Sequence, residues 1–467
     1  MTTHTYQDYE KADDVKTFIM AAIGSHKSSE AYRTARTADL YDRQLNKTVM
    51  EYAQMLFTAQ GVKVEDFTAS SNRIASNFFE RLNTQRVSFS LGAGLSFVQP
   101  DEEQGVGDES KLALGKDIDH VIYEAAYYAC THGVSFCFWN FDHVHMFKLT
   151  EFVPLYDEND GTLRAGIRFW QLSKSKPLNI TFYREEGFSQ WRQVDGQLRP
   201  LDAQGNETDK ETVQPYKTTV SYMPASDEIT VVGEENYGSL PIVPMWASRL
   251  KQSTLVGMRS AIDAYDLIRS GFANDLQDCS VVYWIVSNAG GMSDAELSQF
   301  RDRLKLMHIA NIDGTDGAGI QPYSQDVPYQ SRQAFLTEIR NGIYEDFGAL
   351  DVHTVAAGAT NDHIDAAYQP MEENAADFEY WVGKCIKQLL KLAGIEDEPI
   401  FQRTRISNQK EQVEMLVMEA QWLDAPTVLR KLPNIRPDEV AAILQGVDAE
   451  DMGRFGLIEE EGVTEGD

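Results

Sequence analysis

Two pairs of acidic residues on one predicted helix are the first candidates for chemistry in this chain. Asp263 and Asp266, and likewise Asp275 and Asp278, are three residues apart, which places both carboxylates of a pair on one helical face. Clustered carboxylates hold the metal ions of two-metal nucleases. The pairs keep a hydrolase or nuclease open as an alternative. No serine-elbow, zinc-protease or Cys–His nucleophile pattern accompanies them, so we predict no catalytic residue.

Two further patterns contain metal-ligating residue types. His143 and His145 alternate on a predicted strand beside Asp142, so both imidazoles lie on one face, but no third ligand follows at motif spacing. Residues 311–317 space oxygen ligands as a calcium loop does, but they lack the closing Glu and favour a hairpin turn. No glycine motif for phosphates or dinucleotides is present. We therefore predict no metal and no cofactor.

Composition sets the broad class of the protein. A chain of 467 residues with 42% hydrophobic residues is expected to fold into several domains. The net charge of -30 argues against a protein that grips DNA, because such proteins neutralise phosphates with Lys and Arg. No apolar run is long enough for a membrane span and no secretion signal is visible, so a cytoplasmic site of synthesis is expected. The scattered cysteines are expected to be reduced: Cys130, Cys137, Cys279 and Cys385.

Hydrophobic periodicity predicts an α+β fold with a β-rich middle. Helices are expected over residues 45–58, 71–84, 116–132, 252–279, 293–308, 329–347 and 363–393, with more between 408 and 445. Strands are expected over residues 87–91, 134–139, 143–149, 163–170, 178–183, 190–194, 218–223 and 281–286. Pro370 either kinks the helix that contains it or marks the first turn of that helix.

The order of elements after residue 238 is the most specific feature. An extended run, Leu240–Pro244, leads to the long helix 252–279, which gives way to the strand 281–286. This order resembles the portal proteins of tailed bacteriophages, in which a wing domain leads into a long stem helix and a small clip domain. The extended run and the segments Ile262–Asp266 and Ala273–Leu276 carry most of the resemblance.

The resemblance implies a division of the chain. The expected parts are a wing of N-terminal helices and antiparallel strands (1–251), a first stem helix (252–280), a clip (281–326), a second stem helix (327–348), a tunnel loop with a kinked helix (349–395), a helical crown (396–447) and an acidic disordered tail (448–467).

It also implies site residues. A tunnel loop that faces DNA would contain Val352, His353, Thr354, Val355, Ala357, Gly358, Thr360 and Asn361, although an ordinary helix–helix linker is the alternative. A basic cluster of the clip, at the DNA exit or a docking surface, would contain Arg301, Arg303, Lys305 and His308. Contacts between subunits at the stem and clip would involve Trp284 and Phe347.

The function implied by the resemblance is that of a ring at one capsid vertex of the virion. Twelve copies, or thirteen in isolation, would form the ring in the bacterial cytoplasm. Double-stranded DNA would pass through it during packaging and ejection. The expected partners are the large terminase subunit, head-to-tail connector proteins, and the major capsid and scaffolding proteins, with no membrane. Another virion ring protein, such as a connector, stays open beside the hydrolase.

Overall fold

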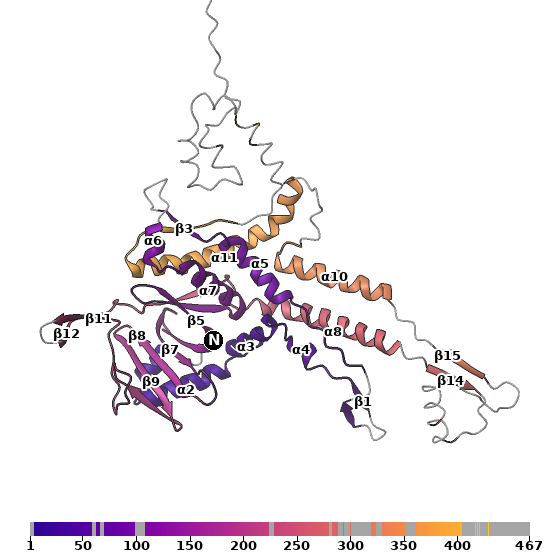
Figure 1. The fold of residues 1–467 in the computed structure, drawn as a ribbon, viewed down its shortest axis with the longest axis horizontal. Coiled ribbons are helices and arrows are strands. Elements are labelled where there is room, and N and C mark those ends of the chain that lie inside the picture. The colour runs from indigo at the N-terminus through magenta and orange to yellow at the C-terminus, as the bar shows by residue number, and fades with distance from the viewer. Residues whose placement is uncertain are drawn as a thin grey trace, which may run out of the picture.

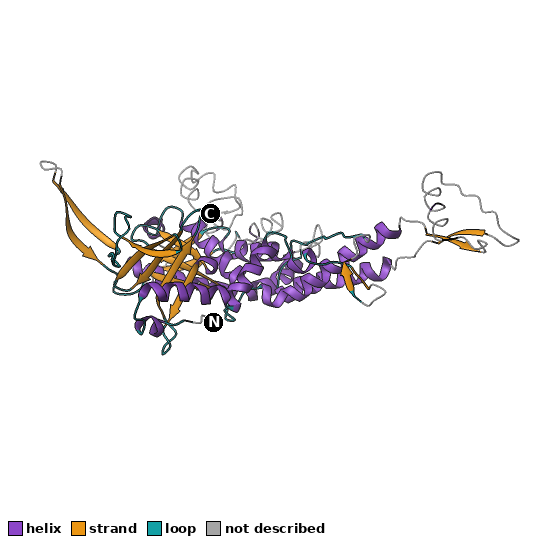
Figure 2. Cartoon of the chain, turned by 90° about the horizontal axis from the view of Figure 1, so that it is seen from below, coloured by secondary structure: helices purple, strands orange, loops and turns teal. Residues whose placement is uncertain are grey.

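The molecule has a body of mixed helices and strands, from which a pair of long helices extends on one side and a β-ribbon on the other (Figure 2). The computed structural model describes residues 4–57, 62–65, 70–98, 108–223, 228–279, 283–287, 319–323, 329–351 and 361–403, with residues 293, 299, 416, 418, 420 and 428. Within these ranges, every helix is too short or too polar to cross a lipid bilayer.

The helices of the described part supply the outer layers and the long pair. They are α1 (Tyr6–Glu10), α2 (Val15–Ser28), α3 (Glu30–Asp42), α4 (Lys47–Met50), α5 (Phe78–Leu91), α6 (Asp108–Ala113), α7 (Ile118–His132), the short 3-10 helix η1 (Leu149–Glu151), α8 (Leu255–Cys279), α10 (Tyr329–Phe347) and α11 (Asn361–Ala393). The predicted bounds of α10 are confirmed, and those of α7, α8 and α11 are confirmed within three residues.

All described strands pair antiparallel. They are β1 (Met55–Phe57), β2 (Lys63–Glu65), β3 (Leu95–Val98), β4 (Val134–Trp139), β5 (Val144–Lys148), β6 (Phe152–Tyr156), β7 (Leu163–Trp170), β8 (Leu178–Arg184), β9 (Gly187–Val194), β10 (Gln197–Leu201), β11 (Lys217–Met223), β12 (Glu228–Glu235), β13 (Ile242–Trp246), β14 (Tyr283–Ser287), β15 (Gly319–Tyr323) and β16 (Glu398–Phe401). The larger sheets have the orders β10-β9-β8-β7-β6 and β13-β4-β5, and the other pairs are β1-β2, β11-β12, β14-β15 and β16-β3.

The body is built in layers around the three-stranded sheet. Strand β4 is buried along its whole length, so its alternating side chains face two different cores. On one side Phe136 packs against Phe152 of the five-stranded sheet, with ring centroids 4.4 Å apart. On the other side Cys137 lies in the core that α5, α7 and α11 share. Helix α2 covers the far face of the five-stranded sheet through Phe18 and Ile19.

The strand predicted at residues 87–91 is wrong, because these residues form the last turns of helix α5. The alternation of apolar and serine residues suggested a half-buried strand. In the fold, however, α5 is enclosed on several sides: Val87 packs with α7 and α11, Phe89 with α11, and Leu82 with α8 and α10. A helix enclosed on several sides does not show a single apolar stripe.

The helix predicted over residues 45–58 is also wrong. Helix α4 ends at Met50, and the chain then enters strand β1, which pairs with β2. The predicted helix over 71–84 begins only at Phe78, because residues 70–77 form neither helix nor strand and are bonded to α8. The strands β6, β10 and β12 were not predicted from the sequence.

Pro370 lies inside helix α11, so the interpretation that the helix begins at this residue is wrong. The helix changes direction along its course (Figure 1). A proline within a helix removes one backbone donor and crowds the preceding turn, which accounts for a bend. The buried side chains Phe378, Val382 and Leu389 hold the remainder of α11 on the three-stranded sheet.

Candidate functional site in the paired long helices

Helices α8 and α10 lie side by side and leave the body together (Figures 1 and 2). Near the body their contact is an apolar seam, in which Leu255 and Ile262 of α8 are at most 1% exposed and Ile343 of α10 is fully buried. Helices α3 and α5 close this seam. Each fully buried side chain of this size contributes about 1.5–3 kcal/mol, so the base of the helix pair is firmly attached to the body.

Phe347 belongs to this seam and is 8% exposed. Its ring is largely buried within its own chain, and the prediction that it contacts a neighbouring subunit stays a prediction. The sequence could not separate the two roles, since an apolar residue at helical spacing suits either core.

Farther from the body the contact between α8 and α10 becomes polar and open. Asp275 of α8 forms an ion pair with Arg332 of α10, and the rings of Phe272 and Tyr329 are 5.9 Å apart. Leu276 of α8 is 54% exposed. The outer half of the helix pair therefore depends on polar and edge contacts.

A row of polar side chains on α8 holds residues 70–77, and we call this row and that segment the polar clasp. Three backbone amides donate to it: Asn72 N to Asn274 Oδ1 at 2.6 Å, Ile74 N to Ser270 Oγ at 3.0 Å and Ser76 N to Asp266 Oδ1 at 2.9 Å. The donors at residues 72, 74 and 76 meet acceptors that are four residues apart on α8, so the contact repeats along both segments.

The carboxylates of the first pair, Asp263 and Asp266, both accept hydrogen bonds from other segments of the chain. Asp266 is fully buried and also accepts from the Asn46 side chain. Burial raises the pKa of Asp266, and its bonds with Asn46 and Ser76 counteract this only in part. Asp263 accepts from Thr48 Oγ1 at 2.7 Å and from the Tyr41 hydroxyl. Both carboxylates therefore bond to donors of their own chain and do not form an open catalytic site.

The second pair does not form a site in the described part of the chain either. Asp275 contacts Arg332, and the Asp278 side chain lies outside the described residues. Among the described residues no group of three His, Cys, Asp or Glu side chains could hold a metal ion. The sequence did contain a signal for the clasp: Asp263, Asp266, Ser270 and Asn274 recur every three or four residues, as one helical stripe does.

The segment that precedes the predicted tunnel loop is fixed tightly. Gly348 ends α10 in the left-handed region, with φ of 66°, and Asn374 of α11 donates to Phe347 O at 2.6 Å. Asp351, which is 8% exposed, accepts from Arg340 at 2.7 Å. The chain therefore enters the loop from a rigid support.

The segment that follows the loop is anchored as well. Ile364, Tyr368 and Met371 of α11 are buried, and the Tyr368 ring stacks on Phe89 of α5 with centroids 5.8 Å apart. The predicted loop residues Val352, His353, Thr354, Val355, Ala357, Gly358 and Thr360 lie outside the described residues. Asn361 is the first residue of α11, and its side chain is likewise outside the described part.

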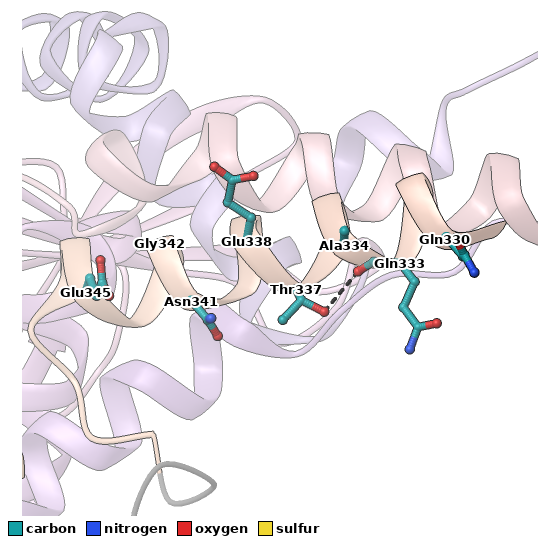
Figure 3. A pocket seen from close by; sticks show the side chains of 8 residues that line it. All are labelled: Gln330, Gln333, Ala334, Thr337, Glu338, Asn341, Gly342 and Glu345. Carbon is teal, nitrogen blue, oxygen red and sulfur yellow. Dashed lines mark hydrogen bonds between the residues drawn. The ribbon is translucent and has the colours of Figure 1, made fainter. Parts of the chain in front are cut away.

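One face of α10 carries a stripe of polar and small residues over most of its length. The side chains project from this single helix around a hollow of about 870 Å³ (Figure 3). The residues that line it are Gln330, Gln333, Ala334, Thr337, Glu338, Asn341, Gly342 and Glu345. The stripe lies away from the apolar seam, and a Cβ atom at Gly342 would meet no atom within 4 Å. Among the described residues, only this helix lines the hollow.

Beyond the helix pair, strands β14 and β15 pair within one chain, with Trp284 opposite Pro322. The predicted strand 281–286 is confirmed for residues 283–286. The Trp284 side chain and the whole basic cluster lie outside the described residues, so Arg301, Arg303, Lys305 and His308 are not located. The prediction that Trp284 contacts a neighbouring subunit stays a prediction.

The histidine pair and the cysteines have simpler surroundings. His143 Nε2 and His145 Nε2 are 2.7 Å apart, and Asp142 bonds to the other ring nitrogen of His143. Burial, together with the neighbouring His143, lowers the pKa of His145. Cys130, Cys137 and Cys385 are free and buried. Burial raises the pKa of the Cys130 thiol to about 11, so this cysteine behaves as a core residue.

Comparisons with known proteins agree with the resemblance noted in the sequence. A family model described as phage portal protein, SPP1 Gp6-like, matches residues 25–452. A portal protein of Clostridium phage phiCD119 is 22% identical over 395 residues, which cover 78% of this chain and 82% of that protein. Its identity is too low to transfer the role of any one residue.

Proposed function

The chain belongs to the SPP1 Gp6-like family of phage portal proteins, because the family match spans residues 25–452, and we propose that it forms the DNA channel at one capsid vertex. Portal proteins are structural components, so the chain is not an enzyme. This excludes the hydrolase and nuclease alternatives, and the closed carboxylates of the polar clasp agree with that. The family match also argues against a connector.

We assign to the described elements the parts that such a ring needs. Helices α8 and α10 would be the stem, strands β14 and β15 part of the clip, residues 352–360 the tunnel loop and the layered body the wing. The α10 stripe would face the adjacent subunit, since α10 alone lines the hollow among the described residues and a Cβ atom at Gly342 would meet no atom within 4 Å. Twelve copies in head-to-tail contact would close such a ring.

The observation that best supports the channel function is that the segments on both sides of residues 352–360 are held by buried contacts. The loop is short and rich in small residues, and both of its ends are held by buried contacts, through Asp351 before it and Ile364 after it. A compliant loop on a rigid support suits transient contact with a moving duplex, because only the loop has to change conformation. An acidic surface would limit adhesion of phosphates to the channel wall. The clip would dock the large terminase subunit and later the connector proteins.

The test removes the loop and keeps its supports. Deletion of residues 355–359 should leave ring formation unchanged and should give heads with less packaged DNA, measured as DNA per head after nuclease treatment. A matched control is deletion of residues 203–205 in the exposed turn between Asp202 and Asn206, far from the helix pair in sequence. Full heads from the loop variant would disprove the DNA-contact role. Loss of rings would instead place the loop in a subunit interface.

A further inference from the structure

A cavity on the wing differs in charge from the rest of this acidic chain. Its volume is about 620 Å³, and it lies between β13, the turn after β6 and the second half of α11. Trp246 and Trp381 form part of its wall, and Lys251, Lys384 and Lys391 line it as well. Among the described residues that line it there is no Asp or Glu, although the chain has 72 acidic and 42 basic residues. We call it the lysine–tryptophan cavity.

The lysines are positioned over aromatic faces. Lys251 Nζ lies 5.2 Å from the centroid of the Trp246 ring and 5.3 Å from that of Trp381, and Lys384 Nζ lies 5.4 Å from the Trp381 ring. Lys251 adopts φ of 50°, a backbone conformation that costs a non-glycine residue about 1 kcal/mol or more. The wing therefore maintains a strained residue at the point where the two indoles share one ammonium group.

These cations have no carboxylate partner in the described part of the chain, whereas a neighbouring lysine on the same helix does. Lys387 forms an ion pair with Glu398 of β16, but no ion pair within 4.0 Å involves Lys251, Lys384 or Lys391 among the described residues. The cavity thus combines exposed positive charge with apolar walls that include Leu240 and Pro244.

A buried donor without a partner also lines the cavity. The hydroxyl group of Tyr156 is buried, and within the described residues it makes no hydrogen bond. Burial raises the pKa of Tyr156, so the hydroxyl stays protonated and can donate. This oxygen has almost no exposed surface, so an occupant of the cavity can bond to it only after the Tyr156 ring shifts.

We propose that the lysine–tryptophan cavity binds the acidic C-terminal segment of its own chain, residues 448–467. This segment holds eight acidic residues and one arginine, and Phe455, Leu457 and Ile458 directly precede Glu459–Glu461. An apolar side chain would enter the cavity between the indoles while the three glutamates reach the lysines. Cavities of a few hundred Å³ accept side chains and small ligands, whereas a DNA duplex is too wide to enter. Attachment to the same chain raises the effective concentration, so weak contacts suffice.

Photo-cross-linking of the full chain tests this proposal. The variant Phe455→p-benzoylphenylalanine should cross-link to peptides that contain Trp246 or Trp381. When light and isotope-labelled chains are mixed before assembly, the cross-links should join peptides of the same isotope. Mixed cross-links would assign the segment to an adjacent copy, and cross-links to other parts of the chain would place it elsewhere. Either result overturns the proposal.

Charge reversal supplies the matched control. Lys384→Glu with Lys391→Glu should lower the cross-link yield about tenfold, whereas Lys387→Glu on the same helix should leave it unchanged. All three side chains are exposed, so the substitutions leave the core intact. Reversal of Glu459–Glu461 to lysines should restore the yield in the double variant. Unchanged yields in the double variant, or protection of these lysines from acetylation by added duplex DNA in place of the segment, would refute the proposal.

Discussion

Removal of the Asp266 carboxylate should open the polar clasp. The variant Asp266→Ala leaves two buried N–H groups without an acceptor, that of Ser76 and one of the Asn46 amide, whose other N–H keeps its bond to Ser76 O. A buried donor without a partner costs about 1–3 kcal/mol. Two of them should cost about 3 kcal/mol in total, once the free energy gained because no carboxylate has to be buried is subtracted. This corresponds to a roughly 100-fold rise in local opening.

The isosteric variant separates hydrogen bonding from packing. Asp266→Asn keeps an oxygen for Ser76 N but turns an amide toward Asn46. The Asn46 Oδ1 atom has no partner among the described residues, so the Asn46 amide can rotate and offer this oxygen to the new amide of residue 266. The rotation breaks the 3.1 Å bond from the Asn46 amide to Ser76 O. The expected cost is about 1 kcal/mol. Asp275→Ala is the control, because its half-exposed ion pair with Arg332 contributes less than about 1 kcal/mol.

Hydrogen exchange by mass spectrometry reads the clasp directly, because the peptide that covers residues 70–77 contains the three bonded amides. Exchange of this peptide should accelerate about 100-fold in Asp266→Ala, severalfold in Asp266→Asn and little in Asp275→Ala. Exchange in Asp266→Ala within threefold of the unmodified protein would refute the clasp. Equal acceleration in peptides of the five-stranded sheet would show global unfolding instead.

Two further predictions concern the body. Phe347→Asp should lower the free energy of unfolding by about 3–5 kcal/mol and not merely block ring formation, since the Phe347 ring lies in the seam at the base of the helix pair. Chemical denaturation of the dissociated subunit measures this change. Unchanged stability together with a loss of rings would instead support the assignment of Phe347 to a subunit interface. Burial raises the pKa of Asp39, but the hydrogen bond and charge of His132, at 2.7 Å, lower it more, so the folded pKa lies below 3.8. The stabilisation from this carboxylate is therefore lost as the pH falls through the folded value. The stability difference between the unmodified protein and Asp39→Asn should shrink as the pH falls below 3.8, and a difference that stays the same from about pH 5 down to about pH 2 would contradict this.

Regular elements with local signals were predictable from sequence. The period of α10 and the capped end of α7 at Gly133, which has φ of 91°, are properties of short stretches. The extended run, long helix and strand after residue 238 identified the family for the same reason, because their order along the chain is itself the signature.

Contacts between distant segments were decided only by the tertiary structure. Asp266 is a helix carboxylate in the sequence, and its role depends on Ser76, which lies 190 residues away. Val87 to Leu91 alternate like a strand, and only the surrounding helices determine that they are helical. Trp246 and Trp381 become one cavity wall because α11 packs on β13. Local pattern specifies which face of an element is apolar, but burial against a partner far along the chain specifies what that face meets.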